Sequence, residues 1–298
     1  MGDRALQESL LRVSHQVRSC ILSLLPSVGG LEGRLYEAMV YVVEGGGKGL
    51  RPFLVVASSH IFSVRESYAL RVASAVEMIH HYSLVHDDLP AMDDDDMRRG
   101  RPCCHIRYDE ATAILVGDGL LTLAFELLSS EETHHDASVR CRLVHGLARH
   151  AGIRGMVGGQ MADLVAQSHD EVTRSHIESL QTMKTGALLF FSATSGGLLG
   201  GASTKDMEAL ESYGRCIGLA FQIADDILDA VGDEEVMGKR AGKDDHAQKA
   251  TFVKALGVAG AQRKAHALVA ESIDGLACFG KEAQPLRDVA LFIVERHA

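Results

Sequence analysis

Two groups of aspartates end long apolar segments, and their spacing could support the chemistry of a bound metal ion. Residues 83–102 read SLVHDDLPAMDDDDMRRGRP, and residues 221–229 read FQIADDILD. Two unit charges about 4 Å apart repel by roughly 4 kcal/mol at an effective dielectric near 20, so crowded carboxylates need a counter-charge. Mg²⁺ takes oxygen ligands and is usually shared between a few carboxylates and a substrate phosphate. Both groups therefore indicate a hard-cation site that serves a phosphorylated substrate.

The second group gathers on one side of a helix. With about 100° per residue, Asp225, Asp226 and Asp229 lie within an arc of about 100°, and Gln222 lies in the same arc. A solvated helix face is the alternative, but these acids interrupt an apolar segment that has no interleaved lysine or arginine. Neither Cys nor His falls on the face of Asp225 and Asp229, so a softer metal is not indicated.

The first group needs a break in its helix. On a straight helix, Asp93 would lie about 240° round from Asp87, so the two carboxylates would point apart. Pro90 disfavours a continuing helix, and we expect an irregular turn at Leu89–Pro90 that brings Asp87, Asp88 and Asp93 together. An EF-hand is excluded, because the glycine at its sixth position and the acid at its twelfth are both missing. A solvated acidic loop is the remaining alternative.

Basic residues stand close to the breaks between apolar segments. The stretch EGGGKGLRP (44–52) lacks the Walker spacing, but its glycines permit close backbone approach and its cations could bind a phosphate. Taken singly, such a cation is more often a surface charge than a ligand. No local signature of a Ser/His/Asp or Cys/His triad is present. The candidate phosphate-binding cations are Lys48, Arg51, Arg98, Arg99, Lys184 (with Thr185) and Lys239.

Helical periodicity dominates the elements that must position these side chains. Alternating strand patterns are absent, and glycine-rich or polar breaks include 44–49, 155–160 and 231–249. We predict one all-α domain over residues 1–298, with about ten or more helices. The segments with apolar residues at spacings of three and four are 4–25, 32–44, 50–63, 67–88, 109–129, 136–151, 174–195, 204–230, 247–270 and 284–296.

Composition narrows the class of protein. Hydrophobic residues make up 46% of the 298 residues, so a large core is possible. A net charge of −10 argues against a nucleic-acid partner, since phosphate-backbone binding needs a basic face. Six scattered cysteines without CxxC spacing, and a start that does not resemble a signal peptide, predict a reduced, cytoplasmic protein. The most apolar stretch, 186–202, is shorter than a membrane span and indicates a buried helix.

The two aspartate groups resemble the first and second aspartate-rich motifs of the trans-type (E)-prenyl diphosphate synthases. GGKGLRP, GMVGGQMADL (155–164), KTGALL (184–189) and GKRAGKDDHAQKATF (238–252) are similar to the family's other blocks and stand in the same order. The resemblance covers nearly the whole chain and is closest to bacterial farnesyl diphosphate synthases. It implies a helical bundle around a deep central cavity, and usually a homodimer.

The resemblance also implies roles for individual residues. About three Mg²⁺ ions would bridge the two aspartate groups to an allylic diphosphate. The implied metal ligands are Asp87, Asp88, Asp93, Asp225, Asp226 and Asp229, and the catalytic set is Asp87, Asp88, Asp93, Lys184 and Asp225. The implied contacts of the allylic diphosphate are Arg98, Lys184, Thr185, Gln222 and Lys239. Those of isopentenyl diphosphate are Lys48, Arg51, His80 and Arg99.

The implied reaction is a head-to-tail condensation that needs no protein nucleophile. The allylic C–O bond ionises, the double bond of isopentenyl diphosphate attacks the cation, and a proton leaves. In the family, residues just before the first motif set product length, here Tyr82 and Ser83. A bulky ring at Tyr82 resembles the floor of farnesyl (C15) synthases, and a geranylgeranyl (C20) synthase is the alternative.

Two further points qualify the resemblance. Gly49 stands where many relatives have arginine, which could weaken the affinity for isopentenyl diphosphate. A non-catalytic regulatory subunit is an alternative from another class, but such a subunit would be expected to have lost motif residues, and both aspartate groups are intact.

Overall fold

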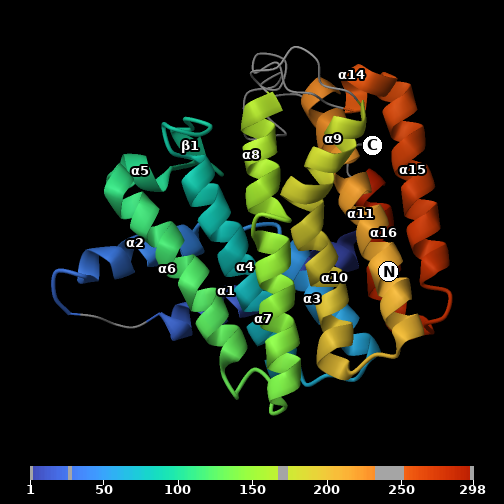
Figure 1. Ribbon diagram of the computed structural model, residues 1–298, viewed down its shortest axis with the longest axis horizontal. Helices are drawn as coiled ribbons and strands as arrows, with labels where there is room; N and C mark the ends of the chain where they lie inside the picture. Colours follow the sequence, from blue (N-terminus) through green and yellow to red (C-terminus); the bar gives the residue numbers. More distant parts are fainter. Residues whose placement is uncertain (1–2, 26–28, 167–173, 232–251, 296–298) are drawn as a thin grey trace. The chain divides into compact units, whose positions relative to one another are not determined.

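The computed structural model describes residues 3–25, 29–166, 174–231 and 252–295 (Figure 1). Contacts divide the chain into two compact units. The amino-terminal unit is Gln7–Val56 with Arg65–Val144, and the carboxy-terminal unit is Met1–Leu6, Ala57–Val64 and His145–Ala298. Helices α1, α3 and α7 each pass from one unit into the other. The single domain expected from the sequence stays a prediction.

The amino-terminal unit is built mainly from α2, α4 and α6. Its elements in chain order are α1 (Asp3–Leu24), α2 (Gly33–Glu44), the start of α3 (Leu50–Ile61), α4 (Glu66–Asp87), β1 (Met97–Arg98), β2 (Arg101–Pro102), α5 (Cys104–Arg107), α6 (Glu110–Ser129) and the start of α7 (Ala137–Ala151).

The carboxy-terminal unit is built around α11, which packs against α10 and α15 (Figure 1). Its elements after α7 are α8 (Met156–Ala166), α9 (Arg174–Gln181), the π-helix η1 (Thr182–Gly186), α10 (Ala187–Gly200), α11 (Thr204–Val231), α14 (Phe252–Leu256), α15 (Val258–Gly275), the 3₁₀-helix η2 (Lys281–Ala283) and α16 (Gln284–Glu295).

Helices α4 and α6 pack closely because α6 has a glycine at the contact. A Cβ at Gly117 would come within 2.0 Å of Nε2 of His86, so only glycine leaves room for the imidazole. His86 Nε2 in turn lies 3.1 Å from the carbonyl oxygen of Ile114. Asp109 caps the start of α6, where its carboxylate accepts a 2.6 Å hydrogen bond from the backbone N–H of Thr112. This packing supports the end of α4, which carries the first aspartate group.

The all-α class is confirmed, with one short exception among the described residues. Strands β1 and β2 pair antiparallel, with Met97 opposite Pro102 and Arg98 opposite Arg101. The two turn residues, Arg99 and Gly100, both have positive φ, at 52° and 74°. A two-residue hairpin favours such a turn because its twist matches that of the strands. The expectation that strands are absent is therefore wrong at this one hairpin.

The helix pattern from the sequence also needs three corrections. The glycine-rich segment 155–160 was expected to be a break, but α8 begins at Met156. The segment 174–195 is interrupted by a π-helix at Thr182–Gly186. The segment 247–270 begins outside the described residues, and its described part, from Phe252, is divided at Gly257, whose φ is 68°. Glycine spacing alone does not separate a helix that packs closely on its neighbour from a loop.

The apolar stretch expected to be a buried helix, 186–202, falls mainly on α10 and is largely buried. Among the described residues, α6 (Glu110–Ser129) is the one helix whose length and composition would let it cross a membrane, and 44% of its apolar window is buried. Core helices meet the same criteria, so this is weak evidence for a span.

Candidate active site

The predicted break after α4 is confirmed. Helix α4 ends at Asp87, and the chain turns so that the backbone N–H of Asp93 donates to the carbonyl oxygen of Asp87 at 2.8 Å. The N–H of Asp95 donates to the carbonyl of Asp88 at 3.2 Å. Asp94 has a φ of 51°, a backbone conformation that aspartate tolerates better than most residues. The turn therefore brings the later acids of the run back to the end of the helix.

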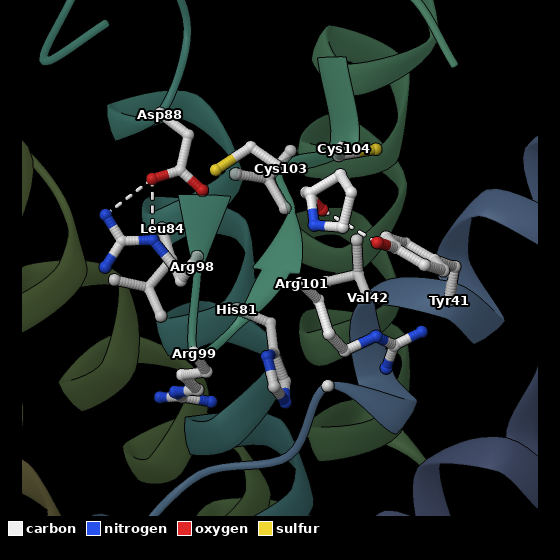
Figure 2. Close-up of a pocket in the computed structure, with 13 residues that line it drawn as sticks. Tyr41, Val42, His81, Leu84, Asp88, Arg98, Arg99, Arg101, Cys103 and Cys104 are labelled. Atoms are coloured by element: carbon white, nitrogen blue, oxygen red, sulfur yellow. Dashed lines mark hydrogen bonds and ion pairs between the residues drawn. The ribbon is translucent and has the colours of Figure 1, made fainter. Parts of the chain in front are cut away.

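Asp88 is directed into the protein rather than outward. It is 3% exposed, and Nε of Arg98 donates to its Oδ1 at 2.6 Å (Figure 2). Nη2 of Arg98 also lies 3.4 Å from Oδ2 of Asp95. Burial by itself lowers the pKa of Arg98, but the hydrogen bond and charge of Asp88 outweigh it and raise that pKa. Asp88 and Arg98 therefore neutralise each other.

Cys103 lies beside this ion pair (Figure 2). Burial, together with the hydrogen bond and charge of Asp88, raises the pKa of its thiol to about 12. Burial also raises the pKa of the neighbouring Cys104 to about 12. Both thiols stay protonated near neutral pH, so neither is poised as a nucleophile.

The hairpin and α4 line a small pocket of about 60 Å³. Figure 2 shows Arg98 turned toward Asp88 on one side, and Arg99 with His81 on another. The pocket is lined by Tyr41, Val42, Gly45, His81, Leu84, Val85, Asp88, Arg98, Arg99, Arg101, Pro102, Cys103 and Cys104. Three arginines at one pocket make it locally positive in a chain of net negative charge.

Two of the cations expected to bind isopentenyl diphosphate lie at defined contacts. Nη1 of Arg51 is 3.5 Å from Nε2 of His80. The guanidinium of Arg99 packs on Gly47, where a Cβ would come within 3.0 Å of its Nη1. Lys48 lies exposed in the loop between α2 and α3. The amino-terminal unit thus places several of the expected cations near the start of α3 and the hairpin.

Gly49 has a physical reason to be glycine in this chain. Its φ is 67°, and a Cβ there would come within 2.9 Å of the Cβ of Ser14. The absence of an arginine at this position therefore fits the local backbone of this protein. Whether it weakens the affinity for isopentenyl diphosphate stays a prediction.

A buried acid that the sequence reasoning missed stands among these cations. Glu77 is 7% exposed, and its Oε1 lies 3.8 Å from Nε2 of His81. Burial raises the pKa of Glu77, while the nearby charges of Arg51 and Arg99 lower it. The signal that could have found it is a lone acid inside the apolar run of α4, four residues before His81.

His80 and His81, which are adjacent on α4, are neutral near pH 7. Burial, and then the charge of Arg99, lowers the pKa of His81 to about 3. Burial, followed by the charge of Arg51, lowers the pKa of His80 well below its usual value. His80 can therefore meet a diphosphate through a neutral ring nitrogen rather than as an additional cation.

The two residues expected to set product length lie one turn before the aspartates. Tyr82 is 6% exposed, and its ring meets His86 edge-on at 5.7 Å between centroids. Burial, and the charge of Asp87, raises the pKa of Tyr82 to about 12. The hydroxyl of Ser83 donates to the carbonyl of His80 at 2.9 Å. Tyr82 is therefore a fixed, neutral ring in the core of the amino-terminal unit.

In the carboxy-terminal unit, the acids of α11 differ from one another in burial. Asp225 and Asp229 are partly exposed and lie one helical turn apart. Asp226 is 3% exposed. Its Oδ1 accepts a 2.9 Å hydrogen bond from Nε2 of Gln222, and its Oδ2 accepts a 2.7 Å bond from the backbone N–H of Phe252. Asp226 thereby joins α11 to the first residue of α14.

Lys184 lies in the π-helix η1, with Thr185 beside it. Its Nζ donates to Oδ2 of Asp163 at 2.5 Å, and Asp163 is 8% exposed on α8. Helix α8 approaches η1 so closely that a Cβ at Gly159 would come within 2.2 Å of the backbone nitrogen of Lys184. Sequence reasoning missed Asp163, although this residue lies in the stretch GMVGGQMADL (155–164). Lys239 lies outside the described residues.

The acids of both groups fit Mg²⁺ by the chemistry of their donors. Asp87 and Asp93 at the end of α4, and Asp225 and Asp229 on α11, are partly exposed carboxylates, and carboxylate oxygens are ligands that Mg²⁺ takes in proteins. Within the described ranges, no three His, Cys, Asp or Glu side chains form a ready-made metal cluster. Such a donor set suits an ion that keeps several waters and takes its other ligands from a substrate.

Comparison with known proteins agrees with this geometry. The family model described as polyprenyl synthetase matches residues 32–276. The chain is 46% identical over 231 residues to a farnesyl diphosphate synthase of Bacillus subtilis, covering 77% of this chain and 78% of that protein. It is 42% identical over 263 residues to a geranylgeranyl diphosphate synthase of Cyanophora paradoxa, covering 88% of each.

A solved structure shows the same fold. The crystal structure of an FPP/GFPP synthase from Zymomonas mobilis superposes with a TM-score of 0.89 at 43% identity, covering 97% of this chain and 99% of that one. The family model covers residues 32–276, the two relatives cover 77% and 88% of the chain, and the solved structure covers 97% of it. The chain therefore belongs to the polyprenyl synthetase family.

Proposed function

We propose that this protein is a Mg²⁺-dependent farnesyl diphosphate synthase. It condenses isopentenyl diphosphate with dimethylallyl and then geranyl diphosphate, head to tail. The observation that carries the proposal is the end of α4, where one turn returns Asp93 to Asp87 while Arg98 and Arg99 follow on the adjoining hairpin. Carboxylates for metal at the end of α4 and cations for diphosphate on the adjoining hairpin thus lie close together in the chain, as a prenyltransferase requires.

The aspartate groups hold the ions in this proposal. Mg²⁺, about three ions per site, would supply positive charge to the departing diphosphate. The protein ligands are drawn from Asp87, Asp88, Asp93, Asp225, Asp226 and Asp229. For Asp88 to serve, its carboxylate has to be shared with or released by Arg98, which donates to it in this structure.

The cations divide between the two substrates. Lys184, Arg98, Thr185, Gln222 and Lys239 hold the allylic diphosphate, and Lys48, Arg51, His80 and Arg99 hold isopentenyl diphosphate. Breaking the allylic C–O bond leaves the electron pair on the diphosphate and a cation on carbon. The double bond of isopentenyl diphosphate supplies the electrons of the new C–C bond, and a proton then leaves. Neutral His80 and protonated Cys103 fit a site that works without a nucleophile.

Product length depends on Tyr82 in this proposal, because its ring is buried one turn before Asp87. Tyr82→Ala should lengthen the main product from C15 toward C20, since the ring would no longer block the growing chain. Tyr68→Ala, on the first turn of the same helix, is the control and should leave the product unchanged. A C15 product from both variants would place the floor elsewhere.

The partner surface we propose is a homodimer contact through α6. Ile114 and Leu115 are adjacent on this helix and remain 44% and 54% exposed. An exposed apolar face of this kind often marks a protein–protein interface. Leu115→Asp should shift the mass measured by light scattering from dimer to monomer. A cytoplasmic location and the absence of a nucleic-acid partner also stay predictions.

The test of function is a product assay on the purified protein. It should convert dimethylallyl and isopentenyl diphosphates to a C15 product with Mg²⁺, and lose activity when the metal is chelated. A dominant C20 product would favour the geranylgeranyl alternative. The 42% identity to the geranylgeranyl diphosphate synthase of Cyanophora paradoxa is the reason to test for it. No turnover with any allylic substrate would favour a non-catalytic subunit.

A further inference from the structure

Gln160 carries a buried amide whose hydrogen-bonding groups are not used within the described part of the chain. Neither its Oε1 nor its Nε2 has a hydrogen-bond partner there, and both atoms are inaccessible to solvent. Leaving such a group unsatisfied costs free energy, so native proteins retain few of them. An orphan amide that persists at a functional site is a candidate contact for a ligand.

The position of Gln160 on α8 places it near Lys184. Gln160 precedes Asp163 by three residues, so the two side chains are about 60° apart around the helix and about 4.5 Å apart along it. Asp163 holds the ammonium of Lys184 at 2.5 Å. The backbone of α8 at Gly159 lies directly against that of Lys184. Gln160 is therefore on the part of α8 that borders the Lys184 site.

We propose that Gln160 contacts the allylic diphosphate substrate beside Lys184. Its N–H donates to a diphosphate oxygen, and its carbonyl oxygen faces the carbon from which that diphosphate departs. One amide can reach both, because the reacting carbon is bonded to the diphosphate. This assignment rests on the proposed function and adds a substrate-binding residue to it.

The chemistry asked of the amide is electrostatic and transfers no atom from the protein. When the allylic C–O bond breaks, its electron pair stays with the diphosphate oxygen and positive charge develops on carbon. The N–H then donates to a more negative oxygen, and the carbonyl dipole faces a more positive carbon. Both contacts are stronger in the transition state than in the bound substrate, so they act on kcat more than on KM.

Replacement by methionine separates this role from a structural one, because methionine has a similar length and no amide. Gln160→Met should raise the melting temperature of the ligand-free protein by about 2–4 °C, since it removes an unsatisfied buried group. The same variant should lower kcat about 10- to 100-fold with little change in either KM. A structural glutamine would lose stability and activity together.

The control is a glutamine that has a partner, Gln284→Met on α16, although Gln284 itself is exposed. Nε2 of Gln284 donates to Oδ1 of Asp288 at 2.8 Å, so this amide has a partner inside the protein. Its loss should lower the melting temperature and leave kcat unchanged. The two replacements should therefore change the melting temperature in opposite directions, and only Gln160→Met should lower kcat.

A lower melting temperature for Gln160→Met would overturn the proposal, because it would show that the amide is satisfied without substrate. An unchanged kcat would also overturn it. Gln160→Leu provides a second variant, and failure of both to fold would count against an unsatisfied amide. If the wild-type protein itself shows no turnover, the proposed function fails, whereas the melting temperatures still test the state of the amide.

Discussion

Replacing Asp226 with asparagine is expected to destabilise the metal-free protein. The carboxylate of Asp226 accepts two hydrogen bonds, from Nε2 of Gln222 at 2.9 Å and from the backbone N–H of Phe252 at 2.7 Å. Asparagine has one acceptor oxygen, so its NH₂ group would have to face one of these two donors. The charge that strengthens both bonds is also lost.

The size of the effect follows from these two contacts. A hydrogen bond to a charged group contributes about 1.5–3 kcal/mol when it is buried. Asp226 is 3% exposed, so solvent cannot replace a lost partner easily. Loss of one bond and weakening of the other should lower the free energy of unfolding by about 2–3 kcal/mol. This corresponds to a fall of about 4–12 °C in melting temperature, at about 2–4 °C per kcal/mol for a larger chain.

The assay is thermal and urea unfolding with a chelator present, so that a lost metal ion cannot contribute. Asp288→Asn is the matched control, because Asp288 is 7% exposed and also accepts from a glutamine four residues earlier, Gln284 at 2.8 Å. Both variants should lose stability. Only Asp226→Asn should also lower kcat, because Asp226 lies on α11 among the proposed metal ligands Asp225 and Asp229.

An Asp226→Asn protein that is as stable as the wild type without metal would refute this reasoning. It would mean that the carboxylate does not hold Phe252 in solution and is available as a metal ligand. A loss of stability that disappears when Mg²⁺ is added would point the same way. The expected result is that Asp226→Asn has a lower free energy of unfolding than the wild type, both with and without Mg²⁺.

Three other changes test the amino-terminal unit. Arg98→Ala leaves the buried carboxylate of Asp88 without its guanidinium and should cost about 2–3 kcal/mol of unfolding free energy in denaturant titrations, given that Arg98 is partly exposed. His81 has a folded pKa of about 3, below its unfolded value of 6.5, so its contribution is complete above pH 6.5 and is lost as the pH falls toward 3. Wild type should therefore lose about 2 kcal/mol more than His81→Gln between pH 7 and 5. Gly117→Ala should displace His86 and cost about 1–3 kcal/mol, measured by thermal unfolding.

For each of these three variants, a specific result would contradict the prediction. Unaltered stability of Arg98→Ala would show that Asp88 finds another cation or water. Equal pH dependence in wild type and His81→Gln would assign the acid sensitivity to other groups, among them Glu77. For the glycine, the control is Gly119→Ala, whose Cβ would meet only the flexible Met39 side chain at 3.3 Å. Equal losses at the two glycines would argue against a specific contact with the imidazole.

The local features of the site could be read from the sequence, because short-range geometry determines them. Proline cannot continue a helix, so the break after Asp88 follows from Pro90 and is present as a turn joining Asp93 to Asp87. The periodicity of α4 and α11 places their acids at the helix positions where they are found. The family could also be identified at this level, because its motifs are local blocks in a fixed order.

Tertiary structure decided which acids face inward. Asp225 and Asp226 are neighbours of the same chemical type, yet one is partly exposed and the other is 3% exposed. On the helix, Asp226 lies at the edge of the acidic arc nearest Ile223, and there the backbone N–H of Phe252 meets it. Asp88 likewise turns to Arg98 of the hairpin. No spacing rule predicts these pairs, because the partners come from separate elements.

The residues that sequence reasoning missed share this cause. Glu77, Asp163 and Gln160 are single polar residues in apolar or glycine-rich segments, and their sequence neighbours do not reveal a role. Glu77 lies near Arg51 and Arg99, and Asp163 accepts from Lys184 of the π-helix, so both have their partners in distant parts of the chain. The amide of Gln160 has no hydrogen-bond partner among the described residues, and its role is the proposal made above. The sequence alone determined the kinds of groups and the helices that carry them. Only packing between elements decided which of those groups meet, because a buried polar side chain is stable where another element supplies its partner.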